Sequence, residues 1–405
     1  MKLGKLFLAG VIALGLMACN KEEVPDLKTG AEATVSVKVF PSSKAPVTRQ
    51  VGDLSGDGVA PAGLAAESAI KNVEVWLFIG ETPDGYKKGN DGEAFVEGIE
   101  TTAGSKNMVV AANANIGAVA NKAALLAQLK NLSQDISTGL VMTSEPVDIT
   151  LVGGKNQYGF KTDDANYDAD AAQQLSLGTR LPITRINARV ALVNLTYEFD
   201  NPFYDKFELT EVSLFNARKS SKLFGTSLVN GTEFLYGSAY PSTLHSYVGS
   251  AGYTGATFTA TADATLAETF VPNPDLAAPK LVDPKNAHYF YAFENTADTP
   301  ENREGTFIVL KGKLFKGDVQ YIAPGLATDD EGFTYYAIWV NAAKDGYTYN
   351  EGHTADGKIM RNTQYNITAT LKKAGNPTID PPVEAQLDVY VEVAPWIVVT
   401  QNVEW

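Results

Sequence analysis

Short runs in which apolar and polar residues alternate recur along most of the chain, and they limit the fold more than any other feature. In "ATVSVKVF" (33–40), Val35, Val37 and Val39 share one face, whereas Ser36 and Lys38 occupy the other. This alternation is typical of a half-buried β-strand. Other strand-like runs, separated by turn residues, occupy 71–79, 106–114, 140–151, 184–199, 207–217, 288–295, 305–315, 332–341, 364–373 and 385–405. The pattern predicts an all-β protein made of two β-sandwiches in tandem.

One helical run and one polar stretch interrupt this pattern. In "AVANKAALLAQLKNLS" (118–133), Leu125, Leu129 and Leu132 follow a helical period, which predicts a minor helix over one end of a sandwich. We interpret the polar stretch "KTDDANYDADAAQQLSLG" (161–178) as the domain boundary, because 405 residues exceed one typical domain. We therefore expect an N-terminal sandwich over 50–180 and a C-terminal sandwich over 181–405.

The first residues carry the features of an export signal. Lys2 and Lys5 precede "LFLAGVIALGLMA" (6–18), an apolar run too short to span a bilayer comfortably. The run leads to Cys19, the only cysteine in the sequence, which has no second cysteine to pair with in a disulfide. The segment "LMAC" that ends at Cys19 resembles the lipobox of bacterial lipoproteins, which implies lipidation of Cys19 and cleavage ahead of it. We expect a signal peptide over 1–18 and a lipidated propeptide over 19–49.

The charge balance argues against one large class of partner. The chain has 33 Lys and Arg residues against 47 Asp and Glu residues, a formal net charge of −14. Loss of Lys2 and Lys5 with the signal peptide would take this charge to −16. A chain this acidic is not suited to bind phosphate backbones or anionic membrane surfaces. We therefore expect no nucleic-acid partner.

The residue patterns of common enzymes are missing from the sequence. The three histidines, His245, His288 and His353, are far apart, and none has the spacing of metal ligands. There is no nucleophile elbow, phosphate-binding loop or Cys–His pair. We expect no catalytic residue, no metal and no cofactor. The aromatic run "HYFYAF" (288–293) is compatible with a carbohydrate platform, but such residues in a strand are more often core.

One acidic segment leaves calcium binding open. Within "DDANYDAD" (163–170), Asp164, Asn166 and Asp168 alternate as the ligands of a calcium loop do. The sixth position of that loop holds Ala169 rather than glycine, and the twelfth holds Leu175 rather than glutamate. A solvated acidic loop is the interpretation that we favour.

The strand at 33–40 is followed by a segment suited to proteolysis. The segment "PSSKAPVTRQVGDLSGDGVAPAG" (41–63) is rich in Pro, Gly, Ser and Asp and contains Arg49. Proteases cut preferentially in exposed loops of this composition. A cut between Arg49 and Gln50 would separate the valine-bearing strand, with its lipid, from the rest of the chain. The sandwich left behind would present open backbone groups beside an apolar groove, which an extended segment of another subunit can fill.

The C-terminal tail, about 384–405, offers a candidate for that segment. Val389, Val391 and Val393 alternate with polar residues, and a second apolar run after Pro395 contains Trp396, Ile397 and Val399. Upstream, three prolines (Pro377, Pro381 and Pro382) make a semi-rigid arm. A strand of this composition suits both donation to a neighbour and a place in its own sandwich, so the sequence leaves open which terminal strand is donated.

Segments spread over the whole chain also carry a family resemblance. They are the "LMAC" segment, the strand ahead of Arg49, "GLVMTSEP" (139–146), "RINARVAL" (185–192), "SSKLFGTSLVN" (220–230), "GKIMRNTQYNIT" (357–368) and "PWIVVTQNVEW" (395–405). Together they resemble the major fimbrillins of the type V pilus family. The resemblance implies two transthyretin-like β-sandwich domains and export as an outer-membrane lipoprotein precursor. It also implies that an Arg-specific, gingipain-type surface protease cuts after Arg49, and that a C-terminal strand of the next subunit fills the groove.

The same resemblance sets the expected role and partners. Repeated exchange would build an extracellular fimbrial shaft used in adhesion and biofilm formation. Expected partners are further copies of the chain, the protease, accessory pilus subunits, and host or bacterial surface receptors. Two alternatives stay open. One is a monomeric surface lipoprotein that binds glycan or host protein, with 34–40 as a permanent edge strand. The other is a tip or anchor subunit of the same pilus.

Overall fold

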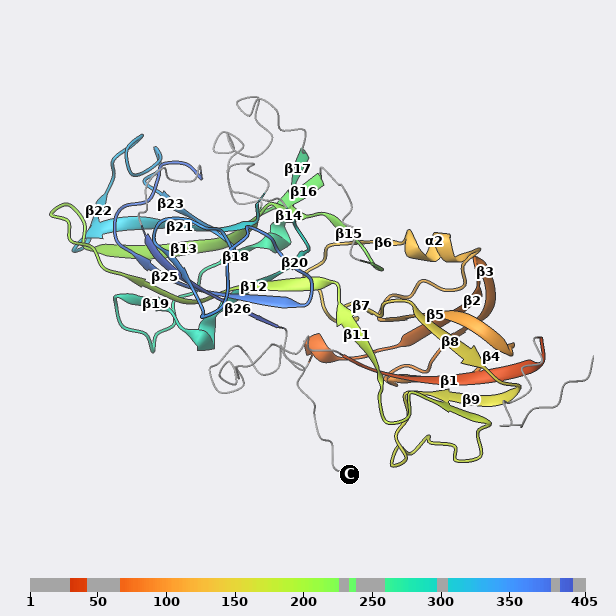
Figure 1. The fold of residues 1–405 in the computed structure, drawn as a ribbon. Helices are drawn as coiled ribbons and strands as arrows, with labels where there is room; N and C mark the ends of the chain where they lie inside the picture. Colours follow the sequence, from red (N-terminus) through yellow and green to blue (C-terminus); the bar gives the residue numbers. More distant parts are fainter. Residues whose placement is uncertain are drawn as a thin grey trace, which may run out of the picture.

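β-Strands make up most of the regular secondary structure in the part of the chain that the structure describes (Figure 1). The computed structural model describes residues 30–41, 66–225, 233–237, 259–296, 305–379 and 387–395. Helix within them is confined to short pieces such as α2 (Lys122–Leu126) and the 3-10 helices η2 (Ala264–Leu266) and η3 (Pro284–Asn286). None of the helices in these ranges has the length and apolar character needed to cross a membrane. The predicted all-β class, with a minor helix, is confirmed.

The N-terminal half is built on one strongly curved sheet (Figure 1). Its ten strands run in the order β10 (Gln173–Leu175), β9 (Gly154–Tyr158), β1 (Glu32–Pro41), β11 (Leu181–Arg185), β7 (Met142–Thr143), β5 (Gly104–Ala112), β2 (Val73–Ile79) and β3 (Thr82–Lys88), with β4 (Phe95–Thr102) beside β1 and β8 (Val147–Leu151) beside β5. Alternate residues of these strands point inward and form one core. That core includes Val37, Val75, Ile99, Val110 and Ile183, all fully buried.

The C-terminal half is a sandwich of two larger sheets with smaller ones beside them. The first sheet orders β19 (Lys280–Val282), β12 (Asn187–Tyr197), β25 (Thr363–Leu371), β26 (Leu387–Pro395) and β24 (Tyr347–Tyr349), with β20 (His288–Phe293) beside β12. The second orders β18 (Ala267–Thr269), β13 (Lys206–Phe215), β21 (Phe307–Lys316) and β22 (Val319–Tyr321), with β23 (Thr334–Trp339) beside β21. Three short strands, β14 (Ala217–Arg218), β16 (Glu233–Tyr236) and β17 (Thr259–Ala262), form a further small sheet. Side chains such as Val190, Leu214, Ile308 and Ile367 fill the core.

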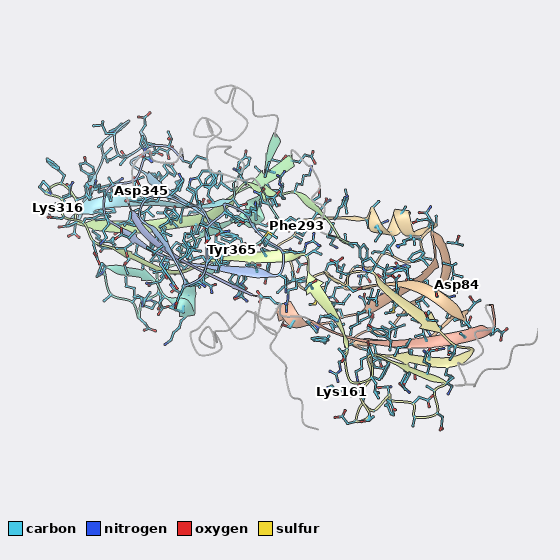
Figure 2. All side chains as sticks on the ribbon, in the orientation of Figure 1. Asp84, Lys161, Phe293, Lys316, Asp345 and Tyr365 are labelled. Atoms are coloured by element: carbon cyan, nitrogen blue, oxygen red, sulfur yellow. The ribbon has the colours of Figure 1, made fainter. Side chains whose placement is uncertain are left out.

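The two halves share a packed junction. The strand β6 (Leu129–Asn131) of the first half pairs with β15 (Ser220–Lys222) of the second. Trp76 on β2 meets Phe224 edge to face, with 6.3 Å between ring centroids. Figure 2 shows side chains filling the space between the sheets on both sides of this region, with Phe293 near it. The hydrophobic core of the C-terminal sandwich therefore continues into the N-terminal half.

A buried ion pair lies at the same junction. Nη1 of Arg189, on β12, donates to both carboxylate oxygens of Glu67 at 2.9 and 3.0 Å, and the Tyr291 hydroxyl donates to one of them at 2.8 Å. Arg185 adds hydrogen bonds to the Glu67 carbonyl oxygen and the Asn362 side chain. Burial is the main cause that lowers the pKa of Arg185, to about 10. Both arginines come from the "RINARVAL" segment. Through them Glu67 is hydrogen-bonded to β11 of the N-terminal sheet and to β12 of the C-terminal sandwich.

The structure corrects two local predictions. The helix expected over 118–133 covers only α2, because Leu129 belongs to β6 and its side chain is 52 % exposed, whereas Leu125 is fully buried. Pairing with β15 replaces the helical hydrogen bonds there. The polar stretch 161–178 is not the boundary between the two halves, since it contains β10 and folds against the N-terminal sheet. The expected C-terminal domain start at residue 181 lies one strand ahead of the second sheet, because β11 pairs with β1 and β7.

Candidate functional site

The first strand, β1, lies inside its sheet and is paired along both edges. On one side it runs antiparallel to β4, with Val35 opposite Ile99. On the other side it runs parallel to β9 and then to β11, with Val39 opposite Leu181. The alternative in which 34–40 is a permanent edge strand is therefore wrong. Removing β1 would leave unpaired backbone groups on both walls of a groove.

The inner face of β1 is fully covered. Val35, Val37 and Val39 are 0, 0 and 1 % exposed, and they belong to the N-terminal core cluster. Burial of one valine side chain contributes about 1.5–3 kcal/mol relative to leaving it in water. These three residues are among those that the sequence predicts for polymerisation, and they lie together on the buried face of the strand that fills the groove.

The outer face of β1 carries specific polar contacts. The register with β4 shifts between Val35 and Val37, and Gly98 occupies the opposite position with a φ of +61°. A glycine accepts this left-handed conformation without the strain that a side chain would add. Its N–H donates to the Ser36 hydroxyl at 3.0 Å, so a side chain of β1 satisfies the amide at the irregularity.

Lys38, also on the outer face, meets a buried carboxylate. Its Nζ lies 2.7 Å from Oδ1 of Asp164, and Nη2 of Arg180 lies 2.8 Å from the same oxygen. The second oxygen, Oδ2, accepts the Lys161 N–H at 2.8 Å. Burial acts to raise the pKa of Asp164, but the hydrogen bonds from the Lys161 amide, Lys38 and Arg180 outweigh it and lower the pKa to about 2. The aspartate is therefore ionised at neutral pH and paired with two cations.

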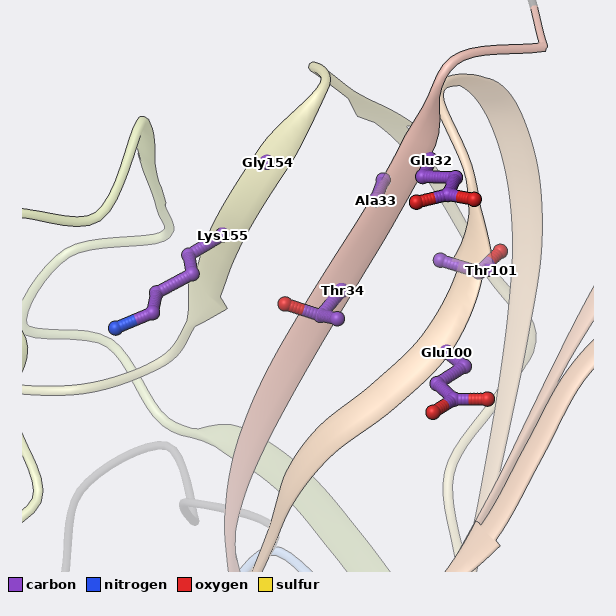
Figure 3. Close-up of a pocket in the computed structure, with 7 residues that line it drawn as sticks. All are labelled: Glu32, Ala33, Thr34, Glu100, Thr101, Gly154 and Lys155. Atoms are coloured by element: carbon purple, nitrogen blue, oxygen red, sulfur yellow. The ribbon is translucent and has the colours of Figure 1, made fainter.

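An open cavity of about 540 Å³ lies over the start of β1 (Figure 3). Glu32 and Thr34 of β1 line it with Glu100 of β4 and Lys155 of β9. Figure 3 shows the two carboxylates on the β4 side of β1 and the lysine on the β9 side. Because β1 contributes residues to this cavity, its shape depends on the strand that occupies the groove.

The last described strand, β26, belongs to the C-terminal sandwich of its own chain. It runs antiparallel to β25, with Val391 opposite Ile367, and parallel to β24. Val389 and Val391 are buried, and Val393 is half-buried. The structure therefore does not bring the valines of the tail near those of β1, since the two sets lie in different sheets (Figure 1). Their roles in polymerisation stay predictions.

Several predicted site residues lie outside the described residues. They are Cys19, Arg49, Gln50, Trp396, Ile397 and Val399, and the same holds for His245. Among the residues that the structure describes, no group of three or more His, Cys, Asp or Glu side chains is placed to hold a metal ion. The aromatic run 288–293 is core, as expected, because Phe290, Tyr291 and Phe293 are buried.

Sequence reasoning missed the contact between Asp164 and β1. The favoured interpretation of 163–170 as a solvated loop is wrong for Asp164, whose side chain is only 7 % exposed. The strand alternation did place Lys38 on the face opposite the valines. No sequence pattern connects it to Asp164, because ion pairs between distant segments depend on how the sheet closes.

Comparison with known proteins gives the family. Residues 33–185 match the family described as major fimbrial subunit protein (FimA), and residues 184–396 match the FimA4 pilin C-terminal domain. The major fimbrium subunit FimA type-2 of Porphyromonas gingivalis is 30% identical, over 100% of both chains. A crystal structure of a fimbrilin (FimA) from P. gingivalis W83 superimposes with a TM-score of 0.69 at 26% identity, covering 93% of this chain and 100% of that one. A putative fimbrium tip subunit, Fim1C of Parabacteroides distasonis, is 27% identical but covers only 57% of this chain and 62% of its own length.

The fold and the family agree on the class of protein, a structural fimbrial subunit with two β domains. The chain belongs to the FimA family of major fimbrial subunits.

Proposed function

We propose that this chain is the shaft subunit of a cell-surface fimbria and polymerises head to tail by protease-triggered strand exchange. The observation that carries the proposal is the position of β1. The strand is central and its apolar face is fully buried. The segment that follows residue 41 is its covalent connection to the rest of the fold. A cut in that segment would make β1 replaceable, whereas an uncut chain keeps its own groove filled.

We infer the maturation steps from the sequence together with the family resemblance. Cys19 would carry the lipid that takes the precursor to the outer membrane, and an Arg-specific surface protease would cut between Arg49 and Gln50. The tail, 384–405, would supply the incoming strand. Residues beyond β26, among them Trp396, Ile397 and Val399, are the better candidates, because residues 387–395 already complete the C-terminal sheet.

The shaft role is favoured over the tip role because more of this chain aligns with major subunits than with the tip subunit. The likeness to a major subunit extends over all of this chain, whereas the likeness to the tip subunit extends over 57% of it. The runner-up, a monomeric lipoprotein that binds glycan or host protein, loses its structural basis because β1 is not an edge strand. Accessory subunits of the same pilus and surface receptors for adhesion and biofilm formation are the further partners of the proposed shaft.

Electron microscopy before and after Arg-specific proteolysis tests the proposal. Wild-type protein should be monomeric before the cut and form fibres after it. Arg49→Ala should fold normally, keep residues 19–49 and stay monomeric. Equal polymerisation of Arg49→Ala without a cut in 42–65 would refute the mechanism.

Surface delivery tests the lipoprotein step separately. Cys19→Ala should accumulate as unprocessed precursor and be lost from the cell surface, as measured by surface labelling and mass spectrometry. Normal amounts of the variant at the surface would remove lipidation from the pathway and leave strand exchange untouched.

A further inference from the structure

The outer wall of the β1 groove contains one buried charged site. Asp164 comes from the polar segment that folds over β1, and its side chain is 7 % exposed. One of its oxygens faces Lys38 of β1 at 2.7 Å and Arg180 at 2.8 Å, and the other accepts the Lys161 amide. Charge-assisted hydrogen bonds of this kind are roughly twice as strong as neutral ones, and burial protects them from screening by salt. Lys38 is the only one of these four groups that lies on the removable strand.

We propose that Asp164, backed by Arg180, is a cation subsite of the β1 groove that binds the Lys38 ammonium and thereby selects the chain's own strand until exchange occurs. The ligand class is a strand that carries an amine or guanidinium on its outer face between two buried apolar residues. The inference rests on the proposed function, because it concerns the same groove.

The tail does not provide this ligand. Residues 387–405 contain no Lys or Arg, and they contain the acidic residues Asp388, Glu392 and Glu404. A strand from the tail would match the apolar floor of the groove but leave the subsite without its strand-borne cation. At similar apolar fit, the groove therefore prefers β1.

Exchange remains feasible because Asp164 does not become an isolated buried charge. After β1 leaves, the carboxylate keeps Arg180 and the Lys161 amide as partners. Removing one partner of a buried pair is severe mainly when the other charge is left uncompensated. The subsite thus slows the loss of β1 without blocking its replacement, and the cut chain should retain the released strand until another strand displaces it.

The first test measures release of the strand from the cut full-length chain. Wild-type, Asp164→Asn and Asp168→Asn proteins are cut with an Arg-specific protease, and the fragment that contains β1 is followed by size-exclusion chromatography and mass spectrometry in moderate urea. Asp164→Asn should release it about tenfold faster, equivalent to about 1.4 kcal/mol. Asp168→Asn is the matched control, because Asp168 lies in the same segment but pairs with Lys155 of β9 at 3.0 Å. Equal release by Asp164→Asn and wild type would overturn the proposal.

Variants of Lys38 separate direct recognition from general loosening. Lys38→Met should release the strand as fast as Asp164→Asn does, and the double variant should release it no faster than either single variant. Lys38→Arg should release it as slowly as the wild type, because it keeps a cation at this position. Additive effects of the two substitutions would contradict a direct pair. If Asp164→Asn does not fold, Lys38→Met still decides, because after the cut it changes only the departing strand.

Hydrogen exchange in the uncut chain tests the subsite without cleavage or polymerisation. Asp164→Asn should lower the protection of the β1 amides, with the β26 amides unchanged as an internal reference. Unchanged protection of β1 would contradict the proposed cation subsite, even if fibres form. If cut wild-type protein never forms fibres, strand exchange is refuted, but the hydrogen-exchange result still tests the subsite.

Discussion

The strands β1 and β26, near the two ends of the chain, occupy equivalent places in their sheets. Each has an antiparallel neighbour on one side and a parallel neighbour on the other, β4 and β9 for β1, and β25 and β24 for β26. Each also buries alternate apolar side chains, such as Val37 and Val391. By apolar pattern and pairing alone, neither strand is easier to remove than the other.

Their outer faces differ. β1 is held by the Lys38–Asp164 pair, with side chains 15 % and 7 % exposed, whereas the ion pair of β26 joins Asp388 to Lys372 at 3.4 Å with side chains 67 % and 37 % exposed. A neighbouring side chain also contacts the β26 backbone, because Asn350 Oδ1 accepts the Val393 N–H at 3.1 Å. Apolar alternation therefore accounts for the burial of both strands, whereas β1 also carries the ion pair that we propose as the basis of strand selection.

Truncation gives the largest expected difference. Deleting 396–405 should leave a folded, processed monomer that does not extend a fibre, because β26 remains in place. Deleting 387–405 should unfold the C-terminal sandwich, because it removes the buried side chains of Leu387, Val389 and Val391. These contribute about 1.5–3 kcal/mol each, out of a typical total stability of about 5–15 kcal/mol. Circular dichroism and electron microscopy of both truncations check this. A misfolded product from the shorter deletion would break the assignment of 396–405 as the donated part.

Matched valine substitutions give an intermediate effect. Val37→Ala and Val391→Ala should each lower the free energy of unfolding of the uncut monomer by about 2 kcal/mol, through lost burial and a residual cavity. In fibres the effects of the two substitutions should differ, because β1 has left the subunit and β26 remains in it. Urea stability of wild-type and Val37→Ala fibres should agree, while Val391→Ala fibres should be weaker. A weakened Val37→Ala fibre would mean that β1 stays in the groove after assembly.

The pH dependence gives the smallest effect, and it has opposite signs for the two strands. The pKa of Asp164 is lowered to about 2, so its pairing stabilises β1 fully above its ordinary value of 3.8 and is lost as the pH falls toward 2. The hydrogen bond to Glu198, with a smaller effect of Asp388, raises the pKa of Lys372, so its contribution near β26 is present below 10.5 and lost as the pH rises further.

Hydrogen-exchange protection measured across pH checks both signs. Protection of β1 should stay constant from pH 7 to pH 4 relative to β26 and fall below about pH 3. Protection of β26 relative to β1 should fall only under strongly alkaline conditions. Loss of β1 protection already at pH 5 would contradict the pairing of Asp164.

Local patterns predict several strands to within two residues. The expected strand 33–40 becomes Glu32–Pro41, and 71–79 becomes Val73–Ile79. The run 184–199 divides into β11 and β12 around Ile186, where the chain passes from one sheet to the next. The helix was overestimated because Leu129 and Leu132 fit a helical period, yet β6 gains hydrogen bonds from a strand about 90 residues away in sequence, which a local pattern does not contain.

The candidate site was predictable in its apolar half only. Alternation identifies the valine face of β1 and the apolar face of the tail, because side-chain direction in a strand has a period of two residues. The partner of Lys38 depends on the folding of 161–178 over the sheet, which brings one carboxylate oxygen of Asp164 into contact with side-chain nitrogens of both Lys38 and Arg180. The subsite therefore depends on how this segment folds over the sheet, which the residue types alone do not indicate.

The direction of β1 has a mechanical consequence for a fibre built on its groove. The strand runs along the length of the N-terminal half, with ladders on both edges (Figure 1). A donated strand pulled along its own axis would load the hydrogen bonds of both ladders in shear, so that they share the tension instead of opening one at a time. The lifetime of the joint under tension would then be set by the slow step in which the whole strand slips out of the groove. A fibre built from such joints would therefore withstand flow.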